Sequence, residues 1–204
     1  MITHKGTQTI KTERLILRRF TVNDATDMFN NWANDERVTR FLTWEPHGNL
    51  ENTQNLLNLW CCGYDSAENY NWAITYNEKV IGSLCVVRMS NRDEYAEIGY
   101  CLGYEFWNNG IMTEAVKAVI TFLFKEVGFN KVCISHAVKN PASGIVAKKC
   151  GLILEGLKRE DFKSRDGEFH DIAIYSILKS EWNRKKRELL KTLALNFILN
   201  YTPE

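Results

Sequence analysis

The stretch from Tyr95 to Ala115 constrains the fold of this chain more than any other part of the sequence. From Tyr95 to Leu102 apolar and other residues alternate, which is typical of a strand. The apolar positions then change to a spacing of three and four residues, which is typical of a helix: Ile111, Ala115, Ala118, Val119 and Phe122. A short polar turn that ends in Gly110 lies between the two halves. The stretch therefore predicts a strand, a tight turn and a helix N-terminus, an arrangement of α/β proteins.

The predicted turn is suited to hold an anion. The first turn of a helix presents unpaired backbone N–H groups and the positive end of the helix dipole. Asn108, Asn109 and Gly110 leave room for a diphosphate to approach that backbone. An ordinary connection between a strand and a helix has the same local pattern, so the rest of the chain must decide between the two interpretations.

Length and composition favour one globular domain. The chain has 204 residues, 45% of them hydrophobic, which is enough for a large core. Its 26 basic and 25 acidic residues give a formal net charge of +1, so no general field attracts nucleic acid or an anionic membrane. No apolar run reaches the ~20 residues of a membrane span, and no apolar signal region opens the chain. We expect a soluble, cytoplasmic protein.

Cysteine and histidine spacing indicates no metal site. His136 and His170 stand alone in the sequence, and lone histidines are more often structural or exposed than catalytic. The cysteines form no Cys-x-x-Cys pair and fall in apparent core segments, so we expect buried, reduced thiols. They are Cys61, Cys62, Cys85, Cys101, Cys133 and Cys150.

Periodicity and turn signals predict the order of the other elements. We expect strands over residues 12–19, 71–76, 80–89, 95–102, 131–138, 152–162 and 168–178. We expect helices after Thr21, over residues 36–41, after Asn49, over residues 111–127 and over residues 141–149. The succession of strand, helix and strand from 95 to 138 implies a parallel pair with a right-handed connection. Residues 1–9 are polar and unpatterned, and we expect a loose arm there.

Residues 1–180 are expected to form the domain, and residues 181–204 a C-terminal amphipathic helical extension. The extension begins with basic residues, and its apolar positions are Trp182, Leu189, Leu190, Leu193, Leu195, Phe197 and Ile198. Packing on the chain's own domain or on the partner in a homodimer is favoured over binding to a membrane surface.

Five short motifs occur in one order and at suitable distances from one another. They are residues 12–18 (TERLILR), residues 97–100 (EIGY), residues 107–115 (WNNGIMTEA), residues 140–143 (NPAS) with 149–156 (KCGLILEG), and residues 167–171 (GEFHD) with Tyr175. With these motifs, residues 12–179 resemble the GNAT superfamily of N-acetyltransferases. Within it, the chain looks like the RimJ/RimL-like branch of ribosomal-protein N-terminal acetyltransferases.

This resemblance implies a fold and a cofactor. The fold is a mixed, mostly antiparallel α/β sheet of about seven strands with helices on both faces, whose fourth and fifth strands are parallel and splay apart. Acetyl-CoA enters the splay, and no metal takes part. The residues implied in cofactor binding are Tyr100, Cys101, Leu102, Trp107, Asn108, Asn109, Gly110, Ile111, Met112, Thr113, Asn140 and Ser143. Met112 departs from the superfamily's usual turn pattern, which requires its side chain to point away from the diphosphate.

Acetyl transfer from a thioester to an amine requires a neutral amine, a site for the oxyanion and a proton for the departing thiolate. With a pKa near ~7.8 for an α-amine and ~10.4 for lysine, deprotonation at pH 7 costs about 1 and about 4.6 kcal/mol respectively. A modest base therefore suffices for a protein N-terminus.

Glu97 is the first candidate for the general base. It shares a strand face with Gly99 and Cys101, in a cleft that we expect to be partly desolvated and to raise the pKa of the carboxyl group. A solvated strand carboxylate is the alternative interpretation of Glu97. Glu160 and Asp161 are the alternative bases, by similarity to relatives that use a carboxylate on the sixth strand.

Ser143 is the candidate acid for protonating the CoA thiolate. Much of the superfamily uses a tyrosine one turn later, where this chain has Ala147. A helix-capping role explains Ser143 equally well. Asn140 is compatible with capping the same helix and with binding the pantetheine amide. A covalent route through Cys101 requires an activating histidine in register, and none is evident.

The sequence therefore predicts an acetyl-CoA-dependent N-acetyltransferase that acts by direct attack in a ternary complex on a protein or peptide α-amine. A small amine such as a polyamine, amino acid or aminoglycoside is the alternative acceptor, and a non-catalytic CoA-binding sensor is the alternative of another class. Trp44 and the aromatic run from Trp60 to Trp72 are candidates for lining the acceptor cleft, although core packing explains them equally well.

Overall fold

The computed structural model describes residues 1–165 and 167–200. Within these residues, eight strands form one sheet in the order β1-β2-β3-β4-β5-β6-β8-β7. The strands are β1 (Ile10–Lys11), β2 (Leu15–Arg18), β3 (Asn71–Tyr76), β4 (Lys79–Ser90), β5 (Tyr95–Leu102), β6 (Lys131–Ala137), β7 (Ile153–Lys163) and β8 (Phe169–Leu178). All neighbouring strands are antiparallel except β5 and β6. The predicted mixed, mostly antiparallel sheet is confirmed, and the short β1 adds an eighth strand.

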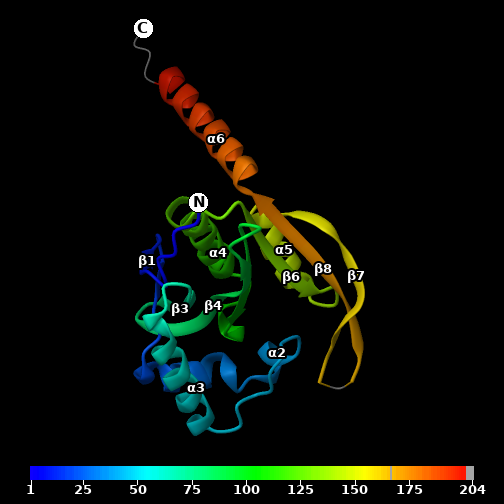
Figure 1. Ribbon diagram of the computed structural model, residues 1–204. Helices are drawn as coiled ribbons and strands as arrows, with labels where there is room; N and C mark the ends of the chain where they lie inside the picture. The colour runs from blue at the N-terminus through cyan, green and yellow to red at the C-terminus, as the bar shows by residue number, and fades with distance from the viewer. Residues whose placement is uncertain (166, 201–204) are drawn as a thin grey trace.

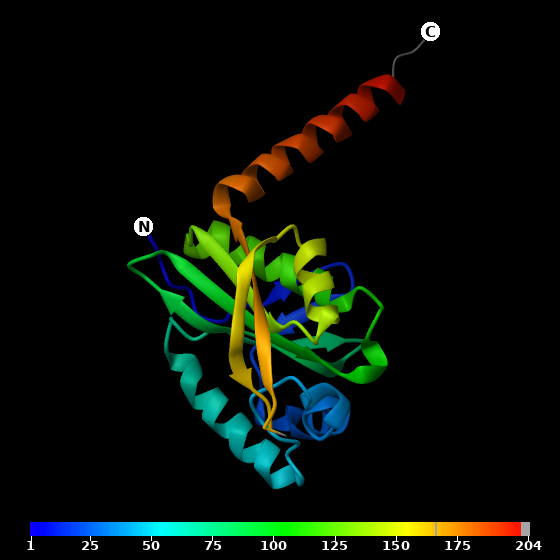
Figure 2. The same cartoon turned by 90° about the vertical axis from the view of Figure 1, so that its right-hand side faces the viewer.

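Helices cover both faces of the sheet, as Figures 1 and 2 show. One face carries α4 (Ile111–Phe122), its π-helical continuation (Leu123–Val127) and α5 (Pro141–Lys149). The other face carries α1 (Ala25–Met28), a π-helical turn (Phe29–Ala33), α2 (Glu36–Thr39) and α3 (Leu50–Cys62).

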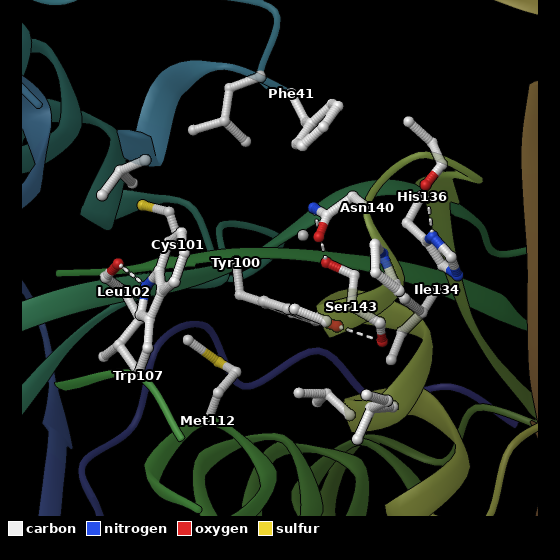
Figure 3. A pocket seen from close by; sticks show the side chains of 18 of the residues that line it. Phe41, Tyr100, Cys101, Leu102, Trp107, Met112, Ile134, His136, Asn140 and Ser143 are labelled. Atoms are coloured by element: carbon white, nitrogen blue, oxygen red, sulfur yellow. Dashed lines mark hydrogen bonds between the residues drawn. The ribbon is translucent and has the colours of Figure 1, made fainter. Parts of the chain in front are cut away.

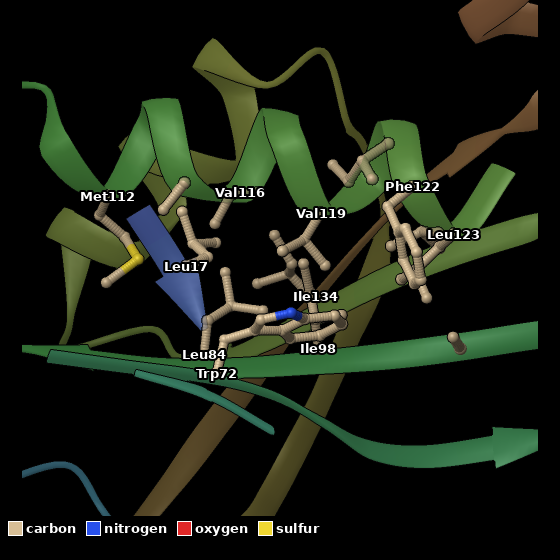
Figure 4. Close-up of a cluster of buried hydrophobic side chains, with 14 of the residues drawn as sticks. Leu17, Trp72, Leu84, Ile98, Met112, Val116, Val119, Phe122, Leu123 and Ile134 are labelled. Carbon is tan, nitrogen blue, oxygen red and sulfur yellow. The ribbon is translucent and has the colours of Figure 1, made fainter. Parts of the chain in front are cut away.

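The core between the sheet and α4 fixes the position of that helix (Figure 4). Trp72, Leu84 and Ile98 of the strands pack in one cluster with Val116 and Val119 of α4, and each is at most 2% exposed. Burying a side chain of this size stabilises a fold by about 1.5–3 kcal/mol. The N-terminus of α4 is therefore held firmly beside the end of β5.

The parallel strands β5 and β6 are paired along only part of their length. The paired residues are Tyr95 with Lys131, Ala96 with Val132 and Glu97 with Cys133. Beyond Glu97 the two strands separate, so the predicted splayed pair is confirmed. On its other edge β5 stays paired with β4 as far as Leu102, which keeps the separated segment in the sheet.

The N-terminal residues are not the loose arm that the polar sequence suggested. The Thr3 amide donates to the Val127 carbonyl at 2.8 Å, and the Gly6 amide donates to the Ala67 carbonyl at 2.6 Å. The side chain of Thr7, a residue that is 2% exposed, donates to the Asn69 carbonyl at 2.9 Å. Backbone and side-chain hydrogen bonds, which leave no apolar pattern in the sequence, fix this segment.

The last helix, α6 (Lys179–Asn200), extends away from the domain (Figures 1 and 2). At its start Trp182 packs beside Phe124, with ring centroids 5.7 Å apart. The side chains of the predicted apolar stripe beyond Trp182, and residues 201–204, lie outside the part that the structure describes. Among the described residues, no helix has the length and apolar character to span a membrane.

Candidate active site

A cavity of about 920 Å³ opens where β5 and β6 separate. Its walls are residues 98–102 of β5, residues 134–137 of β6, residues 106–108, residues 110–113 at the start of α4, residues 140–143, 145, 146 and 149 at and in α5, residues 36–38 and 40–42, and Arg165. In Figure 3 Met112 and Trp107 lie at one end and Phe41 at the other, with Tyr100, Cys101, Asn140 and Ser143 between them. The backbone of β5 that faces the cavity beyond Glu97 has no partner in the strand ladder.

The end of the cavity at α4 is built from backbone. Gly110 precedes α4 with φ at +74°, a left-handed conformation that glycine adopts without strain. A Cβ added there would meet only Arg14 Nη2, at 3.7 Å, so the approach to the first amides of α4 is open. Trp107 Nε1 donates to the Leu102 carbonyl at 2.8 Å and holds the preceding loop against β5.

Arg14 and Glu114 brace this loop from outside the cavity. Arg14 Nη1 donates to the Asn109 carbonyl at 3.0 Å, and Arg14 Nε donates to Glu114 at 2.7 Å. Glu114 also accepts from the Thr12 hydroxyl at 2.6 Å and from the Arg14 amide at 3.0 Å. Burial opposes ionisation of Glu114, but the hydrogen bonds from Thr12 and Arg14 outweigh it and lower the pKa. Glu114 thus remains an anion at the positive end of α4.

Asn140 and Ser143 meet at the centre of the cavity. Asn140 Nδ2 donates to Ser143 Oγ at 3.2 Å, and the Tyr100 hydroxyl donates to the Ser143 carbonyl at 3.2 Å. The side chain of Asn140 makes no capping hydrogen bond to α5, so the predicted capping role was wrong. Because Ser143 Oγ accepts from Asn140, its own proton can point into the cavity.

Cys101 lines the cavity as a neutral thiol. Its sulfur lies 3.1 Å from Ser83 Oγ, and burial raises its pKa to about 11. A thiol with this pKa is not a nucleophile at neutral pH, which disfavours a covalent acyl-cysteine route.

The predicted bases lie outside the cavity wall. Glu97 occupies the last pair of the parallel ladder, 16% of its side chain is exposed, and Oε2 lies 3.9 Å from Arg88 Nε. Glu160 donates its amide to Asp171 at 2.9 Å, and Asp161 lies 3.3 Å from Lys158. Neither of these two carboxylates lines the cavity.

All the predicted cofactor-binding residues except Asn109 line the cavity. They are Tyr100, Cys101, Leu102, Trp107, Asn108, Gly110, Ile111, Met112, Thr113, Asn140 and Ser143. Met112 is only 6% exposed and belongs to the core cluster, although the residue also lines the cavity. Asn109 instead turns its carbonyl to Arg14.

The far end of the cavity was missed by sequence reasoning. Phe41 lines it and makes an edge contact with His170, with ring centroids 6.3 Å apart. Arg165, in the turn between β7 and β8, donates to the Thr39 hydroxyl at 3.4 Å. These contacts join α2 to the β7–β8 hairpin, and only the fold brings the two segments together. Of the two interpretations of Trp44 and the run from Trp60 to Trp72, the structure supports core packing, since those aromatic side chains pack in the cores and do not line this cavity.

His136 also lines the cavity, although the sequence singled it out only as a lone histidine. Its ring stacks on Tyr175 with centroids 5.5 Å apart, and Nδ1 lies 2.8 Å from the Ala137 carbonyl. A Cβ on Gly144 would come within 2.9 Å of Nε2, so glycine lets α5 pack closely over this ring. Among the described residues, no group of three or more His, Cys, Asp or Glu side chains is placed to hold a metal ion.

A splayed parallel pair beside an open helix N-terminus, with a serine between them, is the arrangement implied for a GNAT-type acetyltransferase. The family model described as an acetyltransferase (GNAT) domain matches residues 14–153, and the chain belongs to this family. Its relatives include YoaA of Bacillus subtilis (strain 168), named an uncharacterized N-acetyltransferase. That protein is 29% identical over 172 residues, which cover 83% of this chain and 96% of the relative.

Two further similar proteins carry more specific names. The ribosomal-protein-serine acetyltransferase of Escherichia coli (strain K12) is 31% identical over 100 residues, 48% of this chain and 55% of that protein. The solved structure of RimL, titled a ribosomal alpha-N-protein acetyltransferase in complex with coenzyme A, has a TM-score of 0.76 and 21% identity. It covers 84% of this chain and 98% of its own, and at this identity the similarity shows the fold.

Proposed function

We propose that this protein transfers the acetyl group of acetyl-CoA to the α-amine of a protein or peptide, by direct attack in a ternary complex. The observation that carries the proposal is the continuous cavity from the first turn of α4, past Ser143, to Phe41 of the opposite wall. Such a cavity admits a donor from one end and an acceptor from the other. The name of the Escherichia coli relative, a ribosomal-protein-serine acetyltransferase, supports this acceptor class.

The residues present fit acetyl-CoA, which supplies an activated thioester. The first amides of α4, after the open Gly110, bind the diphosphate. The edge of β5 over residues 100–102, which is not paired with β6, pairs with the amides of the pantetheine arm, as a neighbouring strand does. Asn140 binds the same arm and orients the Ser143 hydroxyl.

Ser143 donates its proton to the departing thiolate. The hydrogen bond that Ser143 Oγ accepts from Asn140 favours this role, because it leaves the hydroxyl proton available. Glu97 accepts the proton of the attacking amine. Because Glu97 lies just beyond the wall of the cavity, we propose that water relays this proton. A neutral α-amine costs far less to generate at pH 7 than a neutral lysine, so this distant base suffices.

The test measures CoA release by the purified chain with acetyl-CoA over a panel of acceptors. The panel contains peptides with free Ser, Ala and Met N-termini, the same peptides blocked at the N-terminus but carrying lysine, and polyamines. We expect turnover with the free N-termini and little with the blocked peptides. Turnover with polyamines alone establishes the small-amine alternative, and tight donor binding without any turnover establishes the sensor.

Variants separate the proposed roles. Glu97→Gln is expected to lower kcat/KM for the best peptide about 100-fold, in the range of general base catalysis. Ser143→Ala is expected to lower kcat more than it raises KM for acetyl-CoA. Glu126→Gln and Ser180→Ala remove the same groups at exposed positions away from the cavity and serve as controls. Full activity in Glu97→Gln contradicts the assignment of the base.

A further inference from the structure

Charged side chains line both ends of the cavity, one at the end beside α4 and four at the end beside α2. Lys149 lines the cavity from the last turn of α5, next to Cys150, whose thiol donates to the Thr113 carbonyl of α4 at 3.5 Å. Lys149 therefore belongs to the end where the diphosphate is proposed to bind. The other charged residues of the wall come from α2, from the residue that follows it and from the β7–β8 turn: Glu36, Arg37, Arg40 and Arg165.

One of the three arginines at the far end is already neutralised. Arg37 donates from Nε to Asp35 at 2.9 Å and lies over the ring of Tyr104 at 3.9 Å. Arg37 is thus engaged within its own segment and has little charge left to offer to a ligand.

Arg40 and Arg165 are not neutralised in this way. The guanidinium of Arg40 lies over the ring of Phe41 at 5.3 Å, and Arg165 Nη2 donates to the Thr39 hydroxyl at 3.4 Å. Neither forms an ion pair with a carboxylate in the part of the chain that the structure describes. Both arginines line the same cavity, and the bond to Thr39 joins the β7–β8 turn to the end of α2, which Arg40 follows.

Cations that line one cavity without an ion pair among the described residues favour the binding of an anion there. Glu36 is the one described acidic residue of this wall, so Arg40 and Arg165 leave it with a positive charge. An arginine guanidinium presents paired N–H donors that match a carboxylate. A cationic acceptor such as a polyamine is repelled by the same wall.

We infer that the acceptor is an α-amine peptide with an acidic side chain close to its N-terminus, bound by Arg40 and Arg165. This inference rests on the proposed acetyl transfer and adds the chemistry of the acceptor. An extended peptide advances about 3.3 Å per residue, so carboxylates at the second, third and fourth positions test different distances between the α-amine and the arginines. Because the arginines contact the acceptor and not the reacting atoms, they act on KM of the peptide more than on kcat.

The experiment compares peptides that differ in one group. Each peptide starts with serine, carries aspartate at position two, three or four, and is matched by the peptide with asparagine at that position. We expect wild type to prefer the best aspartate peptide about tenfold in kcat/KM over its asparagine match. Arg40→Gln and Arg165→Gln are each expected to lower this ratio about threefold, and the double variant to bring it near one.

Two further variants serve as a control outside the cavity and as a charge reversal within it. Arg92→Gln removes an arginine whose side chain is 94% exposed in the turn after β4, outside the cavity wall, and is expected to leave the ratio unchanged. Arg165→Glu is expected to reverse the preference, so that a lysine peptide is acetylated faster than its aspartate match.

The outcomes distinguish the inference from the function on which it rests. A ratio near one in wild type overturns the acidic acceptor while acetyl transfer to peptides stands. An equal loss with aspartate and asparagine peptides in the arginine variants does the same, because it reports general damage. Absence of transfer to every peptide overturns both.

Discussion

Replacing Asp24 with alanine removes the anion of an ion pair on the α1 side of the sheet. The carboxylate accepts from Arg18 Nη1 at 2.7 Å and from Arg18 Nη2 at 2.8 Å. It also accepts from the Thr21 amide at 2.8 Å, which completes the capping box of the following helical turn. The Asp24 side chain is 8% exposed and that of Arg18 is 30% exposed. The substitution therefore leaves Arg18 with most of its charge desolvated and no counter-ion.

The expected loss in the free energy of unfolding is large because the Asp24 carboxylate makes several hydrogen bonds that are lost together. Removing one partner of a fully buried ion pair costs about 3–5 kcal/mol. Arg18 is partly exposed and can regain water, so we expect a loss of about 2–3 kcal/mol, less than the fully buried figure. For a chain of this size that corresponds to a fall in Tm of roughly 4–12 °C.

Urea denaturation at pH 7 of wild type, Asp24→Ala, Arg18→Met and the double variant measures the coupling between the two residues. We expect a coupling free energy of about 2 kcal/mol, since the second substitution has little left to remove. Asp161→Ala is the control. Its ion pair with Lys158 is 3.3 Å long and about half exposed, so the change should stay within about 0.5 kcal/mol. Additivity of the Asp24 and Arg18 variants within about 0.5 kcal/mol refutes the reasoning.

The same variant predicts a pH dependence. Burial opposes ionisation of Asp24, but the hydrogen bonds from Arg18 and Thr21 outweigh it and lower the pKa. A lowered pKa stabilises the folded state above the unfolded pKa of ~3.9, and this contribution disappears as the pH falls through the folded pKa. The stability difference between wild type and Asp24→Ala should be constant from pH 7 to 5 and shrink below about pH 4. A difference that grows as the pH falls below 4 contradicts this.

Two further substitutions test residues that support the wall of the cavity, Gly82 behind β5 and Glu114 in the first turn of α4. In Gly82→Ala the new Cβ would lie 2.5 Å from the Cys101 carbonyl, so β5 must shift, and thermal unfolding should show a loss of at least about 2 kcal/mol. Gly156→Ala, where nothing lies within 4 Å, is the matched control and should change Tm by less than about 2 °C. Glu114→Gln removes the charge that orients Arg14, so KM for acetyl-CoA should rise about fivefold with kcat nearly unchanged in steady-state kinetics. An unchanged KM would show that the contact between Glu114 and Arg14 is not needed for binding acetyl-CoA.

The strands and the long helices could be predicted because their signal is local. Alternation in Tyr95–Leu102 follows from one more deeply buried face of a sheet, and the spacing within Ile111–Phe122 from one buried face of a helix. The π-helical turns at Phe29–Ala33 and Leu123–Val127 could not be predicted. They accommodate an extra residue through tertiary packing and leave the apolar spacing nearly unchanged.

One end of the cavity could be predicted from local sequence, and the other could not. The end at Gly110 depends on a turn and the first turn of a helix, both of which a short stretch of sequence encodes. The opposite end depends on Arg165 meeting Thr39, residues 126 positions apart, and no local pattern reports such a contact. Arg88 lies beside Glu97 across an irregularity in the register of β4 that follows Val86, which the sequence does not signal either.

The separation of β5 from β6 also has a consequence for the lifetime of the protein. The part of β5 beyond Glu97, which is more than half of this central strand, lacks one neighbour, and a sheet interrupted in this way opens more easily than a continuous one. A ligand that lies in the gap binds only the folded chain, and at 100 times its Kd it adds about 2.7 kcal/mol to the free energy of unfolding. Resistance to proteases should therefore follow the supply of that ligand, so that starvation for it shortens the survival of the protein as well as its turnover.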